Sequence, residues 1–161
     1  MPIEDDFYTA VDDLKKPSED AGAGFVGEAG FGSGVFYLYI CIDRALLLRN
    51  LGGDDNAGLA ATGIAALVEA AATVSPGGKQ ASFASRACAH YILAERGDAQ
   101  PRTLGAAFAK PVGDDPVRAS VAALRAWRDD MDRAYGPVMA RAEMEVGKDG
   151  SLADVIAFCR G

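Results

Sequence analysis

The sequence is poor in the residues that enzymes use for proton transfer and metal binding. It has a single histidine, His90, and three widely spaced cysteines, Cys41, Cys88 and Cys159. Metal sites usually need four ligands, and Cys88 with His90 supplies two. No Ser/His/Asp or Cys/His set can be assembled around His90, which we expect to be a packed side chain. We therefore expect no catalytic residues, no metal, no cofactor, and reduced thiols in place of a disulfide framework.

Long apolar runs are also absent. The longest one, residues 57–68, is too short to span a bilayer. The first six residues lack the basic and apolar regions of a signal peptide. The chain has 161 residues, of which 50% are hydrophobic and 24% charged, as in a soluble globular domain. We expect a cytoplasmic protein with no membrane partner.

The chain does have an acidic, glycine-rich arm at residues 1–34. Eight acidic residues against Lys15 and Lys16 give this arm a net charge of −6, out of −7 for the whole chain. A segment this polar cannot bury enough apolar area to fold alone. We therefore expect its large side chains to contact another molecule. Residues 35–161 are about neutral, and the acidity of the arm therefore does not exclude a phosphate-rich partner.

The rest of the chain predicts an α+β fold with few strands. Residues 35–42 are β-branched and aromatic on both faces, which predicts an interior strand, and residues 89–95 predict a second one. Capping and periodicity signals predict helices after Asp43, over 57–74, from Asp115-Pro116 to Gly136-Pro137, and after Ser151. An interior strand needs neighbours on both edges. We expect the missing strands to come from another chain or another copy.

Gly22-x-Gly24-x-x-Gly27 matches the dinucleotide-binding fingerprint letter for letter. That fingerprint works only between a buried strand and a helix. Here polar residues precede it and further glycines follow it. We interpret the motif as a flexible hairpin tip, and a nucleotide-binding enzyme is the weakest of three functional hypotheses.

Two motifs favour contact with nucleic acid. Residues 76–80 place Lys79 and Gln80 on a glycine loop, where an ammonium and backbone amides can hold a phosphate, although the same loop also suits a plain connection. The second motif is an aromatic and β-branched wedge of the kind that stacks on bases or separates them. It consists of Phe7, Tyr8, Thr9 and Val11. The alternative is that the aromatic pair docks on the protein's own body.

Four long segments, in order, closely resemble the backbone subunit of the type I-E CRISPR surveillance complex Cascade, the CasC family. The segments are DDFYTAVDDL, GSGVFYLYICID with LLLRNLGGD after it, SPGGKQASFA, and AERGDAQPRTLGAAFAKPV. The resemblance spans about two thirds of this chain and about the C-terminal half of the family protein. This chain begins at a point in the middle of the family sequence and covers only about half of it. We therefore expect a truncated form, a split subunit or an internal-start product.

The resemblance implies a partial ferredoxin-like, RNA-recognition-like palm at residues 35–161 and a β-hairpin thumb at residues 1–34. In the family, copies assemble along the guide RNA, and each thumb interrupts the guide–target duplex. By that resemblance, the rising strand of the thumb and Val26 on the returning strand contact the nucleic acid. Lys79 and Gln80 match the loop suited to the guide's backbone, and Lys110 is a weaker candidate of the same kind.

Our first hypothesis is thus a non-catalytic subunit that binds guide RNA (crRNA) and target DNA, beside adjacent copies and other Cascade subunits. The second is a fragment that self-associates, as a homodimer, into an assembly module without binding RNA.

Overall fold

The structure, a computed structural model, describes residues 3–9, 26–78 and 84–161. The chain divides into two compact units, Met1–Phe36 and Tyr37–Gly161. Together they mix helices with small antiparallel sheets, so the predicted α+β class is confirmed. No helix in the described residues is long and apolar enough to cross a membrane. The assignment of the two parts to a thumb and a palm stays a prediction.

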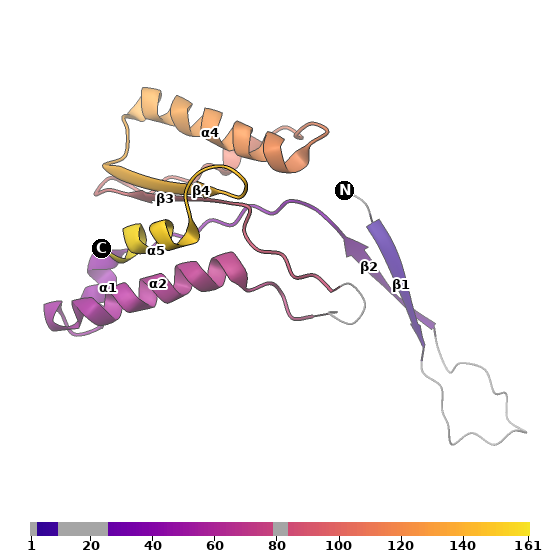
Figure 1. The fold of residues 1–161 in the computed structure, drawn as a ribbon, viewed down its shortest axis with the longest axis horizontal. Coiled ribbons are helices and arrows are strands. Elements are labelled where there is room, and N and C mark those ends of the chain that lie inside the picture. Colours follow the sequence, from indigo (N-terminus) through magenta and orange to yellow (C-terminus); the bar gives the residue numbers. More distant parts are fainter. Residues whose placement is uncertain (1–2, 10–25, 79–83) are drawn as a thin grey trace, which may run out of the picture. The chain divides into compact units, whose positions relative to one another are not determined.

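The first unit is built on an antiparallel hairpin (Figure 1). Strand β1, Ile3–Thr9, pairs with β2, Val26–Gly32, so that Phe7 lies opposite Glu28 and Thr9 lies opposite Val26. Gly27, the last glycine of the dinucleotide-like motif, is a strand residue here. A strand at that position is incompatible with the helix that a dinucleotide site would need.

The second unit contains the remaining elements. They are α1 (Arg44–Asn50), η1 (Asp54–Asn56), α2 (Ala57–Thr73), β3 (Tyr91–Arg96), η2 (Gly105–Phe108), α4 (Pro116–Tyr135), β4 (Ala140–Glu145) and α5 (Leu152–Arg160). Strands β3 and β4 form a two-stranded antiparallel sheet, with α4 on one side and α5 on the other (Figure 1). Helix α2 packs against α5.

All four predicted helices are confirmed, and local capping signals explain where α1, α4 and α5 begin. The Asp43 carboxylate accepts a hydrogen bond from Leu46 N at 2.8 Å, and Asp115 accepts one from Arg118 N at 3.3 Å. Ser151 Oγ accepts one from Asp154 N at 3.1 Å, as a capping box requires. Gly136, with a φ of 89°, ends α4 in a conformation that favours glycine.

The two faces of the β3–β4 sheet differ in chemistry. Side chains alternate along a strand, so Ile92, Ala94, Ala142 and Met144 share the face toward α5. Val155 of α5 is completely buried there, and Arg96 lies over the ring of Phe158 with 4.9 Å from its Cζ to the ring centroid. This side is the apolar core that joins the sheet to α5.

The opposite face joins the sheet to α4 through charge. Arg125 of α4 donates hydrogen bonds to Glu143 at 3.3 Å and to buried Glu145 at 2.6 Å. The Tyr91 hydroxyl donates to Glu143 at 2.5 Å. Because both carboxylates are paired, α4 is held in one register on the sheet.

A second charged group lies farther along the same face. The Asp132 carboxylate of α4 accepts hydrogen bonds from Arg141 of β4 and, at 2.7 Å, from Arg102. Arg102 also donates to Glu95 of β3 at 2.6 Å. This cluster therefore links α4, both strands and the segment that leads to η2.

The predicted strand over residues 35–42 is wrong for this structure. Residues 33–43 form neither strand nor helix, although their composition is typical of a strand. A strand exists only with a partner, and within the described residues none is hydrogen-bonded to this segment. The second predicted strand is confirmed as β3, displaced by two residues at its start, and His90 lies just before it, half-buried.

Candidate nucleic-acid interface

The β1–β2 register sorts the predicted wedge onto two faces of the hairpin. Phe7 and Thr9 are two residues apart and share one face, and Tyr8 between them points to the other. Val26 lies opposite Thr9 and joins Phe7 and Thr9 on their face. The structure thus brings together three of the predicted contact residues, from both strands. We call Phe7, Thr9 and Val26 the wedge face.

The wedge face presents large apolar side chains to solvent. Phe7 is 66% exposed and Val26 70% exposed, and Thr9 is exposed as well. Across the strands, Val26 and Thr9 are direct neighbours and Phe7 lies diagonal to Val26, a spacing within reach of an aromatic ring. An aromatic ring beside β-branched side chains has the shape and apolarity to enter between stacked bases.

Tyr8 has a different role in the hairpin, because its ring covers Gly27 of β2. Tyr8 and Gly27 are directly opposite in the ladder, and the ring leaves no room for a Cβ at position 27. An aromatic ring over a cross-strand glycine shields backbone that lacks its own side chain. Tyr8 therefore stabilises the hairpin, and its predicted contact with nucleic acid stays a prediction.

Charge limits what this hairpin can bind. The strands Ile3–Thr9 and Val26–Gly32 contain no lysine or arginine, and the wedge face also carries exposed Asp5 and Glu28. The carboxylates of Asp5 and Glu28, on the same side of the hairpin as Phe7, Thr9 and Val26, repel phosphates. These strands thus offer no cation to a phosphate, and their exposed apolar side chains are suited to stacking and apolar contacts.

The predicted phosphate-binding residues belong to the second unit. Lys79 and Gln80 lie outside the described residues, as does Val11 of the first unit. The chain on both sides of the Lys79 loop is fastened: Ser75 Oγ donates to the Ser85 carbonyl at 3.0 Å, and Ala89 N donates to the Ala72 carbonyl at 2.8 Å. These two hydrogen bonds hold the described residues on either side of residues 79–83 close together.

Lys110 is exposed just after η2 and forms no ion pair within residues 3–9, 26–78 and 84–161. It therefore meets the steric requirement for a phosphate contact. In the same described ranges, no group of three or more His, Cys, Asp or Glu residues is placed to hold a metal ion. That the protein is not an enzyme stays a prediction.

Comparison with known proteins gives the family. The profile of the CT1975-like protein family matches residues 1–155. This chain belongs to that family. Among curated proteins, none matches it significantly.

Two solved structures similar to this CT1975-like chain are described as CRISPR surveillance complexes. One, described as a CRISPR RNA-guided surveillance complex, is 28% identical with a TM-score of 0.70, and the match covers 96% of this chain and 58% of that one. A second, described as a CRISPR RNA-guided surveillance complex, pre-nicking, is 25% identical with a TM-score of 0.68. That match covers 96% of this chain and 41% of the other. The chain thus spans about half the length of the structures it matches.

These matches confirm the similarity to a Cascade-type subunit that the sequence predicted. The assignment to type I-E is not tested by these matches and stays a prediction. The pairing of Tyr8 with Gly27 was missed by sequence reasoning. Its only signal was a glycine in the returning strand, which gains meaning once the hairpin register is known.

Proposed function

We propose that this CT1975-like chain is part of a non-catalytic backbone subunit that binds the guide RNA of a type I-E CRISPR surveillance complex. In this proposal the hairpin is a thumb whose wedge face enters the duplex of guide RNA and target DNA. The observation that carries it is the gathering of Phe7, Thr9 and Val26 on one exposed face of a hairpin. The similarity to chains of CRISPR RNA-guided surveillance complexes supports RNA as the class of ligand.

The chemistry of the hairpin favours bases over backbone. Stacking of a base on an aromatic side chain contributes about 1–3 kcal/mol, and apolar wedges pry base steps apart. The acidic residues beside the wedge face oppose binding to phosphates. A thumb of this kind displaces a base and leaves sequence reading to pairing between guide and target.

We assign binding of the phosphate backbone of the guide RNA to the second unit. Lys79 and Gln80 on their glycine loop, with Lys110 as a weaker contributor, are proposed to bind phosphates. The neutral charge balance of residues 35–161 tolerates this, because the −6 charge is confined to residues 1–34. Adjacent copies and other subunits supply the remaining contacts, and target cleavage is assigned to a separate recruited helicase-nuclease.

Filter binding of guide RNA to the complex assembled with this chain tests the proposal. We expect Lys79→Ala with Gln80→Ala to weaken binding about tenfold at moderate salt, because phosphate contacts dominate affinity. Lys148→Ala is the matched control: it removes the same charge, but Lys148 Nζ lies 2.9 Å from Glu145 Oε1 in an internal ion pair. Equal affinity for the double variant and the parent chain would refute the assignment.

A further inference from the structure

Three arginines of the second unit converge on the last residues of α5. The Arg44 guanidinium donates hydrogen bonds to the Cys159 carbonyl at 2.7 Å and to the Arg160 carbonyl at 3.4 Å. The Arg96 guanidinium lies over the ring of Phe158, and Arg160 itself is exposed. We call Arg44, Arg96 and Arg160 the arginine cluster.

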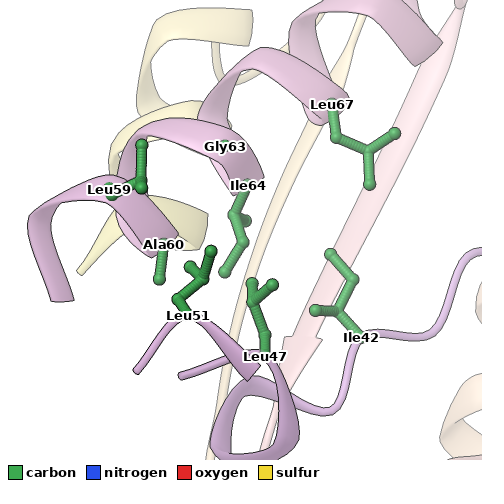
Figure 2. Close-up of a pocket in the computed structure, with 8 residues that line it drawn as sticks. All are labelled: Ile42, Leu47, Leu51, Leu59, Ala60, Gly63, Ile64 and Leu67. Carbon is green, nitrogen blue, oxygen red and sulfur yellow. The ribbon is translucent and has the colours of Figure 1, made fainter. Parts of the chain in front are cut away.

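Packing beneath the arginine cluster holds its members in place. Arg44 is the first residue of α1, and Figure 2 shows Leu47 of that helix pointing toward Ile64 of α2. Arg96 is the last residue of β3. Burial raises the pKa of the Cys159 thiol, and the charges of Arg44 and Arg96 oppose that rise. Both guanidinium groups therefore lie close to the same side chain.

The arginine cluster has no carboxylate partner in the described part of the chain, where none of its three guanidinium groups forms an ion pair. Asp43, next to Arg44, caps α1, and Asp98, two residues after Arg96, is exposed. Six other arginines of this unit each pair with an aspartate or a glutamate: Arg102, Arg118, Arg125, Arg128, Arg133 and Arg141. The fold thus leaves the cluster without a direct counter-ion.

Capping of a helix end accounts for one cation but not for three. The C-terminus of a helix carries about half an elementary negative charge, and the two hydrogen bonds of Arg44 already satisfy its carbonyl groups. Further positive charges close by repel one another. An anion relieves that repulsion, and the planar guanidinium fork matches the oxygen atoms of a phosphate.

We propose that the arginine cluster binds the phosphate backbone of the DNA strand that is displaced when the guide RNA pairs with its target. Recognition of duplex DNA by a guide releases one strand, and proteins hold such strands through positively charged surfaces. This inference rests on the proposed function, because a displaced strand exists only where a guide is bound.

The position of the cluster separates it from the phosphate site proposed at Lys79. Arg44 lies beside Ala57 and Ala60, at the start of α2. The residues on either side of 79–83 are held at the other end of that helix, where Ala89 N donates to the Ala72 carbonyl. Helix α2 has 17 residues and is about 25 Å long at about 1.5 Å per residue. One phosphate cannot contact both sites, so we assign them to different strands.

Two DNA probes of the same sequence test the proposal on the guide-loaded complex assembled with this chain: the duplex target, and the target strand alone. Arg96→Gln with Arg160→Gln should weaken binding of the duplex about tenfold and leave binding of the single target strand unchanged. For the duplex, the slope of log affinity against log salt should become shallower by about 1.4, since each phosphate contact to a single strand contributes about 0.7.

Two further double variants serve as controls. Arg118→Gln with Arg133→Gln removes the same charge from two exposed arginines, but each of these is paired within the fold, so binding of the duplex should not change. Arg96→Lys with Arg160→Lys keeps the charge and should retain most of the affinity. Circular dichroism of each variant verifies folding.

Other results overturn the proposal. Equal loss for both DNA probes, or no loss for the duplex, excludes a contact with the displaced strand. Weaker binding of guide RNA by Arg96→Gln with Arg160→Gln assigns the cluster to the guide. If this variant instead abolishes association between copies in light scattering and leaves duplex binding unchanged, the cluster binds an acidic protein segment such as residues 1–34 of a second copy.

Filter binding of guide RNA distinguishes this failure from failure of the proposed function. A complex that binds no guide RNA even with the parent chain refutes the proposed function. A complex that binds guide RNA normally, and whose affinity for the duplex is insensitive to the glutamine substitutions, refutes only the role of the arginine cluster.

Discussion

The ring of Tyr8 lies over Gly27 in the opposite strand and fills the space where a side chain at position 27 would begin. Because side chains alternate along β1, Tyr8 lies on one face of the hairpin, and Phe7 and Thr9 project from the other beside Val26. Because residue 27 is a glycine, the Tyr8 ring has room to lie across the opposite strand.

Gly27→Ala should displace the Tyr8 ring and weaken the hairpin. Amide exchange of residues 3–9 and 26–32 should quicken in this variant, and Tyr8→Ala added to it should recover part of the loss. We expect a coupling energy of about 1 kcal/mol, as for residues in direct contact. Gly30→Ala is the control, because the nearest atom to its Cβ would be Asp5 Oδ1 at an ordinary 3.7 Å. Equal effects at both glycines would contradict the contact.

Phe7→Ala and Val26→Ala should reduce base displacement in the guide–target duplex. A series of duplexes with 2-aminopurine at successive positions reports unstacking as fluorescence, and we expect the signal at the displaced position to fall by about half or more. Tyr8→Phe, which keeps the ring over Gly27, should leave the signal unchanged. A loss with Tyr8→Phe and none with Phe7→Ala would reverse the assignment of the two faces.

Acid should loosen α4 from the sheet. Hydrogen bonds from Arg141 and then Arg102 lower the pKa of Asp132, against the opposing effect of burial. A carboxylate with a lowered pKa stabilises the fold above its ordinary pKa, near 4, and this contribution is lost as the pH falls through the lowered value. Urea unfolding should show a plateau above about pH 5 and a decline below about pH 4. Asp132→Asn should flatten that decline more than Asp98→Asn, a change at an exposed carboxylate.

Alkali should act on the same interface through Tyr91. Burial, with the hydrogen bond to Glu143, raises the pKa of its hydroxyl. The folded state therefore holds this proton more tightly than the unfolded state, and stability should fall as the pH rises above about 10, the ordinary tyrosine pKa. Tyr91→Phe should remove that alkaline decline in urea titrations. A decline that persists in Tyr91→Phe would place its origin in another group.

Sequence predicted the helices well because their signals are local. Asp43, Asp115 and Ser151 each cap the helix that follows, and these hydrogen bonds form within three residues. A strand signal is not local. Residues 35–42 have the composition of a strand, but pairing depends on a partner, and no strand among residues 3–9, 26–78 and 84–161 is hydrogen-bonded to them.

Strand β4 forms in the structure but was not predicted from the sequence. Its sequence, ARAEME, alternates small apolar residues with charged ones, and the charged positions are the ones that bind α4. The apolar face of β4 consists of two alanines and one methionine, and its other face is charged, so its hydrophobic pattern is a weak strand signal. Likewise, the predicted wedge residues were close together in sequence, but only the register of β1 and β2 divides them between two faces.

Photocrosslinking tests the central claim most directly. With p-benzoylphenylalanine in place of Phe7, the assembled complex should crosslink to a base of the guide–target duplex at regular positions. The same group in place of Tyr135, an 82% exposed aromatic residue at the end of α4, should not. Crosslinks from position 135 alone, or from neither position, would contradict a thumb whose wedge face enters the duplex.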